Sequence, residues 1–180
     1  TFVIQVGDLT ARGNDADIAT RAAAAEPLSR AGIGFFPMRG NHEYYAKPEG
    51  VNQYGIPAFR MNFPQTRGLG DNLHGARGWS SPTSVSPYLD GMSYSFDFGE
   101  TGNSARFVIM KLITPGKGLP HENGYKYGYS VHDQQAWISS RLDKGKRGTT
   151  HAFVYSHQNL IGQNHQDSLF TGYTDANPAW

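Results

Sequence analysis

Short apolar runs alternate with polar stretches along the chain and predict where the strands and helices lie. Residues 2–6 and 33–38 read as two buried strands, because each is short and rich in branched or aromatic side chains. Between them, residues 14–30 predict a helix with an alanine-rich centre, for which Asn14 or Asp15 can be the N-cap. The opening of the chain is therefore a strand–helix–strand unit with parallel strands.

The remainder of the chain predicts a hairpin, a second helix and a last strand. Residues 92–98 and 105–112 read as two antiparallel strands joined by a glycine-containing turn. Residues 132–142 predict a helix, and residues 151–156 predict the last strand. In contrast, residues 44–90 show no clear period and are rich in glycine, proline, serine and asparagine, with scattered aromatic residues. We expect them to form a long loop insertion on the substrate side of a site.

Composition and charge narrow the class of protein. The 180 residues are expected to form a single α/β domain over residues 1–180. A net charge of +1 gives no electrostatic footprint for nucleic acid, and no apolar run is long enough to span a bilayer. The absence of cysteine excludes disulfides and thiolate metal sites. Because the chain opens at Thr1, almost inside a strand, we expect an upstream segment with any signal peptide to be missing, and the localisation stays undetermined.

Three of the predicted strands run directly into polar residues that suit a metal ion. Asp8 follows the first strand, Asn41 and His42 follow the second, and His157 follows the last. Sites in open α/β sheets gather beyond the carboxyl ends of the strands, so these side chains could meet at one sheet edge. Carboxylate, amide and imidazole ligands suit Mn, Fe or Zn. A carboxylate such as Asp8 can bridge two cations that act on one phosphoryl group.

Each of these residues also has a purely structural interpretation. Asp8 can be a turn residue or the cap of the following helix, and His157 can be a structural histidine at a strand end. Residues 40–43, Gly-Asn-His-Glu, form the more specific pattern because they follow a strand directly. The order and strand context of all three motifs favour the metal site.

These motifs resemble those of the calcineurin-like metallophosphoesterase superfamily. The blocks of that family run Asp-x-His, Gly-Asp, Gly-Asn-His-Asp/Glu, His and Gly-His-x-His. Here residues 7–8 read Gly-Asp, residues 40–43 read Gly-Asn-His-Glu, and His157 supplies the single histidine. The resemblance spans nearly the whole chain. It implies mixed β-sheets flanked by helices in a four-layer metallophosphoesterase sandwich.

The resemblance also implies a role for each matching residue. Asp8 would bridge two metal ions, and Asn41 and His157 would bind the second of them. His42 would be the catalytic imidazole, which protonates the leaving oxygen or stabilises the transition state, and Glu43 could orient it. The implied activity is hydrolysis of phosphomonoester or phosphodiester bonds by a dinuclear Mn, Fe or Zn centre. No residue of the chain identifies the substrate.

Two blocks of the family are missing here. No Asp-x-His precedes Asp8, and no Gly-His-x-His follows His157. We therefore expect the sandwich to be incomplete at both termini. At most one metal ion is expected to bind, and the fragment is expected to be weakly active or inactive.

Residues 7–13 bear on the subfamily and on substrate binding. They resemble the Gly-Asp-x-x-Asp-Arg-Gly of protein Ser/Thr phosphatases, with Ala11 in place of the second Asp. Arg12 could contact phosphate as a fork of donors, or it could be a surface residue at the start of the helix. A different class of function also stays open. It is a non-catalytic binding module on the same fold, which would use the aromatic-rich 44–90 loop to hold a ligand or partner.

Overall fold

The computed structural model describes residues 1–40, 42–44, 56–111 and 131–157. The described part contains three α-helices, three short 3-10 helices and six strands. In chain order these are β1 (Phe2–Val6), α1 (Asp15–Arg30), β2 (Gly34–Met38), η1 (His42–Tyr44), α2 (Ile56–Asn62), η2 (Pro64–Arg67), β3 (Arg77–Ser80), η3 (Pro87–Leu89), β4 (Tyr94–Glu100), β5 (Asn103–Met110), α3 (Val131–Leu142) and β6 (His151–Ser156).

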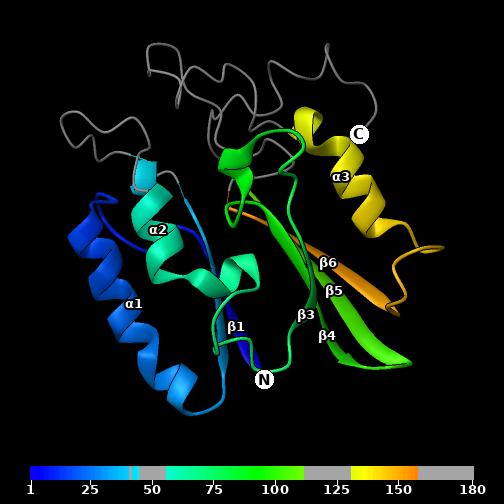
Figure 1. Ribbon diagram of the computed structural model, residues 1–180, viewed down its shortest axis with the longest axis horizontal. Helices are drawn as coiled ribbons and strands as arrows, with labels where there is room; N and C mark the ends of the chain where they lie inside the picture. Colours follow the sequence, from blue (N-terminus) through cyan, green and yellow to red (C-terminus); the bar gives the residue numbers. More distant parts are fainter. Residues whose placement is uncertain (41, 45–55, 112–130, 158–180) are drawn as a thin grey trace.

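The elements stack in layers, as Figure 1 shows. β1 and β2 form a parallel two-stranded sheet, and the other strands form a second sheet in the order β3-β4-β5-β6. The second sheet is mixed, because β4 pairs antiparallel with β3 and β5 whereas β6 pairs parallel with β5. Helices α1 and α2 pack on the outer face of the first sheet, and α3 packs on the outer face of the second. The prediction of an α/β fold with mixed sheets and flanking helices is confirmed.

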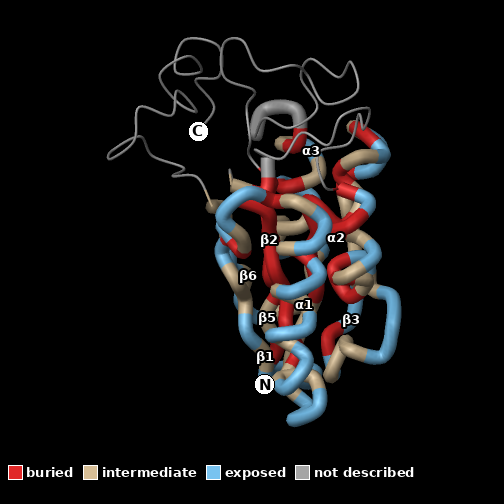
Figure 2. The backbone as a smooth tube through the Cα atoms, turned by 90° about the vertical axis from the view of Figure 1, so that its left-hand side faces the viewer, coloured by how far each residue is buried: buried red, intermediate tan, exposed pale blue. Residues whose placement is uncertain are grey.

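Burial follows these layers (Figure 2). β2 is buried along its whole length, because it lies between the helices and the second sheet. Aromatic and aliphatic side chains fill the space between the two sheets, and the rings of Phe36 and Phe96 approach to 4.4 Å between centroids. Full burial of one such side chain stabilises the fold by about 1.5–3 kcal/mol. Packing between the layers therefore fixes where the strand ends lie.

Helix α1 confirms the helix predicted over residues 14–30. The side chain of its N-cap, Asn14, accepts a hydrogen bond of 2.8 Å from the backbone N–H of Asp17. The chain leaves the helix through Gly32, whose φ of +71° is a left-handed conformation that glycine adopts without strain. Ile18 is the fully buried residue of this helix. Ala22, Ala25 and Leu28 pack beside it as partly buried residues.

The predicted hairpin, second helix and last strand are also confirmed. β4 and β5 pair in antiparallel register from Tyr94 opposite Ile109 to Glu100 opposite Asn103. Helix α3 and strand β6 begin and end within one residue of their predicted bounds. In the described part of the chain, none of the helices is long and apolar enough to cross a membrane.

The interpretation of residues 44–90 as a loop without regular structure is wrong for their described part. That part contains α2, η2, β3 and η3, while residues 45–55 lie outside the described residues. α2 has seven residues and β3 has four, with a register irregularity in its pairing to β4. Elements this short do not repeat often enough to show a period in the sequence.

A second correction concerns the three strands with polar ends. They could have met at one edge of a single sheet, but β1 and β2 lie in the first sheet whereas β6 lies in the second. The two sheets pack face to face through their apolar sides. This packing brings the carboxyl ends of all three strands to the same end of the molecule.

Candidate functional site

Three of the predicted site residues come together beyond the carboxyl ends of β1, β2 and β6. The parallel register pairs Val6 with Met38, so the loops that follow these two strands run side by side. The backbone N–H of His42 donates a hydrogen bond of 3.1 Å to Oδ1 of Asp8 across these loops. From the second sheet, Nδ1 of His157 lies 2.8 Å from the carbonyl oxygen of Val6.

The carboxylate of Asp8 lies at the centre of this group. Nε2 of His157 lies 3.3 Å from its Oδ1, and Nε2 of His42 lies 3.9 Å from its Oδ2. The exposed fractions of the side chains are 37% for Asp8, 45% for His42 and 21% for His157. Solvent can therefore reach all three.

Backbone carbonyls fix the orientation of both imidazoles. His157 places Nδ1 against Val6 O at 2.8 Å, and His42 places Nδ1 against Ala11 O at 3.0 Å. A carbonyl oxygen can only accept a hydrogen bond, so Nδ1 carries the proton in each ring. In the neutral ring the lone pair then lies on Nε2, which faces Asp8. Metal-binding histidines are commonly held in this way by a backbone carbonyl.

Two glycines allow the loops to approach Asp8 closely. A Cβ atom at Gly7, whose φ is +86°, would collide with the ring of His157. A Cβ atom at Gly40 would collide with the backbone and carboxylate of Asp8. Asp8 itself has a φ of +49°, a left-handed conformation that Asp tolerates better than most residues. The motif glycines are therefore required by the packing of the backbone around the site.

Glu43 joins the two loops through its buried carboxylate. Its Oε1 accepts hydrogen bonds from the backbone N–H of Thr10 at 2.8 Å and from the Thr10 hydroxyl at 3.1 Å. Its Oε2 accepts a hydrogen bond of 2.7 Å from the backbone N–H of Gly40. Gly13 also packs against this residue, since a Cβ atom there would lie 2.5 Å from Glu43 Cα. One side chain thus ties the loop after β1 to the loop after β2.

This geometry gives Glu43 a different role from the one expected. The resemblance suggests that it could orient His42, but its carboxylate oxygens bond to the two loops, and the carbonyl of Ala11 holds the imidazole. No signal in the sequence points to Thr10 beyond its position two residues after Asp8. Arg39, buried beside the motif, supports the same loop by donating a hydrogen bond of 2.9 Å to the Glu43 carbonyl.

The structure says less about the other two predicted site residues. Asn41 lies outside the described residues, so its role as a ligand stays a prediction. Arg12 is exposed between Asp8 and α1, and its role in substrate binding also stays a prediction. Within the described ranges, no three His, Cys, Asp or Glu side chains are grouped to hold a metal ion. Asp8 and His157 form a pair of potential ligands, and Asn41 is the third ligand that the resemblance implies.

The spacing of this pair fits two ligands of one metal ion. Neighbouring ligand atoms at about 2.0–2.2 Å from a tetrahedral or octahedral ion lie about 2.8–3.6 Å apart. Oδ1 of Asp8 and Nε2 of His157 are 3.3 Å apart. The donor types, carboxylate oxygen and imidazole nitrogen, are also those that Mn, Fe and Zn accept.

Comparisons with protein-family models, curated proteins and solved structures give no match for this chain. The resemblance to metallophosphoesterases therefore stays a hypothesis. It depends on three short motifs, and described residues from each of them are adjacent in the fold, namely Asp8, Gly40 with His42, and His157.

Proposed function

We propose that this chain belongs to a metal-dependent phosphoesterase of the calcineurin-like type, which hydrolyses phosphomonoester or phosphodiester bonds. The observation that carries the proposal is the meeting of Asp8, His42 and His157 at the strand ends of two stacked sheets. Exposed charge pairs contribute only about 0–1 kcal/mol to stability. Stability therefore gives little reason for two oriented imidazoles to face one exposed carboxylate, whereas a metal-dependent site requires such a group.

The arrangement of layers supports the same proposal. Helices, a sheet, a second sheet and a helix follow one another, and the motif residues lie where the strands of both sheets end. This order is the one expected for the four-layer metallophosphoesterase sandwich. In that sandwich the loops beyond the strand ends carry the ligands. Here the loop after β1 would supply Asp8, and the loop after β2 would supply Asn41.

Asp8 and His157 would hold one divalent cation, Mn, Fe or Zn, with Asn41 as a third ligand. A second cation would need further ligands, and the described residues supply no ligand group for it. When bound, such an ion lowers the pKa of a coordinated water and polarises phosphoryl oxygens. The chain contributes the fixed direction of the ligands, since Val6 O sets the ring of His157.

His42 would act on the leaving group. Its Nδ1 is held by the Ala11 carbonyl, so Nε2 faces the site beside Asp8. A protonated imidazole in this position can donate its Nε2 proton to the leaving oxygen of a bound ester. Arg12, exposed four residues after Asp8, would contact a non-bridging phosphate oxygen through its guanidinium group.

Hydrolysis of p-nitrophenyl phosphate and of its bis ester, with Mn²⁺ added after chelation, tests this proposal. We expect at most weak Mn²⁺-dependent hydrolysis, which His42→Ala lowers to the level measured without Mn²⁺ while Mn²⁺ binding is kept. Asp8→Asn should lose both hydrolysis and Mn²⁺ binding. Glu100→Gln, a change at an exposed acid on β4, is the matched control and should behave like the wild type.

Two results would count against it. Unchanged Mn²⁺ binding by Asp8→Asn would overturn the metal site. Tight Mn²⁺ binding at Asp8 without hydrolysis of either ester, in a chain that carries all the ligand blocks of the family, would favour the binding module on the same fold instead.

A further inference from the structure

Arginine side chains gather around one carboxylate on the outer face of the second sheet, the face on which α3 packs (Figure 1). Arg77 on β3 lies opposite Asp97 on β4, and Asp97 lies opposite Arg106 on β5. Residues directly opposite each other on antiparallel strands carry their side chains on the same face. These three residues therefore form one row across the sheet. The row shares no residue with the candidate metal site.

Arg141, in the last turn of α3, joins this row from the helix. Its Nε donates a hydrogen bond of 2.8 Å to the Ser95 hydroxyl on β4, and its Nη2 donates one of 3.1 Å to the carbonyl oxygen of Gly78. A Cβ atom at Gly78 would lie 2.9 Å from Oδ2 of Asp97. Because this residue has no side chain, the Arg141 guanidinium and the Asp97 carboxylate come together beside Arg77.

Positive charge exceeds negative charge in this group. Nε and Nη2 of Arg106 lie 2.7 and 2.8 Å from Oδ1 and Oδ2 of Asp97, so the carboxylate is held by both arms of one guanidinium. The side chains of this pair are only 7% and 14% exposed. The single carboxylate is thus already matched by Arg106. Among the described residues, neither Arg77 nor Arg141 forms an ion pair of its own.

Both of these unmatched guanidinium groups face solvent. Arg77 is exposed, and the hydrogen bond from Arg141 to Gly78 lies on the exposed side of the sheet. Burial lowers the pKa of Arg141 and the like charge of Arg106 lowers it further, whereas Asp97 raises it. An anion beside Arg141 would offset this repulsion, because opposite charges at contact distance attract.

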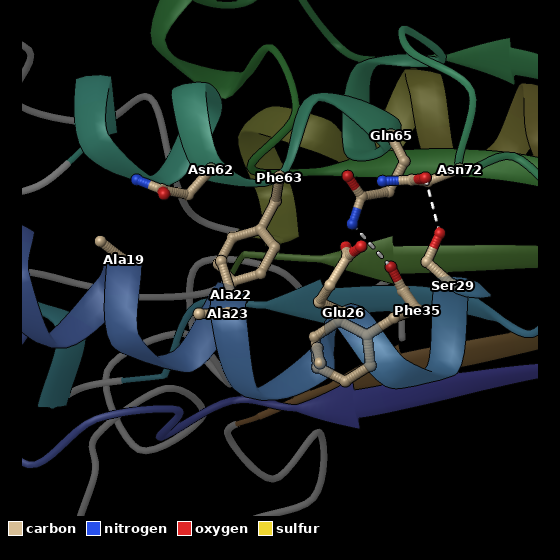
Figure 3. Close-up of a pocket in the computed structure, with 11 residues that line it drawn as sticks. Ala19, Ala22, Ala23, Glu26, Ser29, Phe35, Asn62, Phe63, Gln65 and Asn72 are labelled. Carbon is tan, nitrogen blue, oxygen red and sulfur yellow. Dashed lines mark hydrogen bonds between the residues drawn. The ribbon is translucent and has the colours of Figure 1, made fainter. Parts of the chain in front are cut away.

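The cavity between α1 and the segment formed by α2 and η2 differs in this respect (Figure 3). It has a volume of about 310 Å³, and its one charged lining residue, Glu26, lies 3.0 Å from a counter-ion, Arg30. The hydroxyl of Ser29 on its wall donates a hydrogen bond of 2.7 Å to Asn72. The cavity therefore has no excess charge that would select a ligand, whereas the row of arginines has one.

We propose that Arg77 and Arg141 bind a phosphate group on the outer face of the second sheet. A guanidinium presents its N–H donors as a planar fork that matches two oxygens of a phosphate. Nη1 of Arg141 makes no hydrogen bond within the described part of the chain, and the whole fork of Arg77 is free there. Two unmatched positive charges suit a phosphate dianion better than a carboxylate, which carries one negative charge.

Titration of the metal-free protein with inorganic phosphate at constant ionic strength, followed by amide NMR shifts, tests the proposal. We expect saturable shifts at Arg77, at Gly78 and in the last turn of α3, and binding of acetate at least about tenfold weaker. Arg77→Gln should weaken phosphate binding by about tenfold or more. Arg30→Gln, which removes an exposed positive charge from α1, is the matched control and should leave binding unchanged.

Vesicles of phosphatidylcholine, with and without phosphatidate, distinguish the two sources of such a group. Sedimentation with vesicles that requires both phosphatidate and Arg77 assigns the phosphate to a lipid headgroup. Saturable binding of inorganic phosphate without such sedimentation assigns it to a small soluble molecule. Arg141→Lys keeps the charge but removes the fork, and it should weaken binding in either case.

His42→Ala separates this inference from the proposed phosphoesterase, because it should leave the phosphate shifts around Arg77 intact. The proposal is overturned if neither inorganic phosphate nor phosphatidate vesicles bind. Equal binding of acetate, or equal losses in Arg77→Gln and Arg30→Gln, would overturn it too, since net charge alone would then explain the binding. If Arg141→Lys fails to fold, Arg77→Gln still decides the question, because Arg77 is exposed and makes no hydrogen bond through its side chain in the described part.

Discussion

The carboxylate of Glu43 accepts three hydrogen bonds, two from Thr10 and one from Gly40, while the residue is fully buried. A carboxylate away from water is stable only when such bonds replace its hydration. The bonds therefore hold the loops after β1 and β2 at a fixed spacing. Since Asp8 lies on the first loop and His42 on the second, Glu43 sets their separation without lying among them.

Glu43→Gln should separate the loops without changing the shape of the side chain. One of the backbone N–H groups that now donates to the carboxylate would face the amide nitrogen of glutamine, which cannot accept a hydrogen bond. We expect the free energy of unfolding to fall by about 2 kcal/mol, measured by urea denaturation. Glu100→Gln, at an exposed position, should change it by less than about 0.5 kcal/mol. Equal effects of the two variants would contradict the role given to Glu43.

Gly40→Ala tests the close approach of the two loops. The added methyl group would collide with Asp8, so either the loop or the carboxylate must move. Overpacking of this kind costs about 1–3 kcal/mol. We also expect Mn²⁺ binding, measured by calorimetry, to weaken by about tenfold or more. Gly145→Ala is the matched control, because its Cβ would meet only the carboxylate end of Asp143, at 3.3 Å.

At the scale of elements, local signals in the sequence predicted α1, the hairpin, α3 and β6. Asn14 caps α1 through its own side chain, and β4 alternates because its aromatic residues Tyr94 and Phe96 face the space between the sheets. These signals lie within a few residues of the elements they predict. The position of Asp8, His42 and His157 at strand ends could be predicted for the same reason, because each follows a strand directly.

Contacts between distant segments could not be predicted in this way. The hydrogen bonds between Glu43 and Thr10 join residues 33 positions apart, and no local sequence pattern predicts them. The separation of the strands into two sheets depends on which apolar faces pack together, as Phe36 packs on Phe96. α2 and β3 were not predicted, because they are short and depend on neighbouring elements for their stability.

Tyr94 links the two sheets through one hydrogen bond. It lies on β4, and its hydroxyl donates to the carbonyl oxygen of Pro37 on β2 at 2.9 Å. Burial raises the pKa of Tyr94 well above the ordinary value of a tyrosine, because the phenolate would lose its hydration. The folded protein therefore keeps this hydroxyl protonated at a pH where the unfolded chain loses the proton.

Tyr94→Phe should lower the free energy of unfolding by about 1 kcal/mol at neutral pH, because the bond to Pro37 is lost. The raised pKa stabilises the folded state fully below the ordinary tyrosine pKa of about 10 and less as pH rises above it. The advantage of the wild type over Tyr94→Phe should therefore shrink above pH of about 10. Urea denaturation of both proteins at neutral and alkaline pH measures it, and a constant difference would contradict the assignment.

At the scale of the whole molecule, the candidate metal site joins the two sheets. Asp8 follows a strand of the first sheet, and His157 follows a strand of the second. An ion bound by both residues would connect the two sheets in addition to the apolar contacts between them. Binding to the folded state alone stabilises it in proportion to the logarithm of the free ligand concentration.

Mn²⁺ should therefore raise the melting temperature of the wild type. At a concentration about 100 times Kd, the expected stabilisation is about 2.7 kcal/mol. His157→Ala should lose most of this effect, whereas His151→Ala, at an exposed position on the same strand, should keep it. Elemental analysis should find one metal equivalent per chain. Two equivalents would contradict the single site.

The hydrogen bond from His157 to the Val6 carbonyl joins positions 151 residues apart in the chain. Closing so long a loop costs entropy that local contacts do not offset, so such a contact forms late in folding. Both sheets must exist and be docked before Asp8 and His157 can face each other. A cation that binds them therefore cannot guide the early steps of folding. It would act on the finished molecule, by slowing unfolding while leaving the folding rate unchanged.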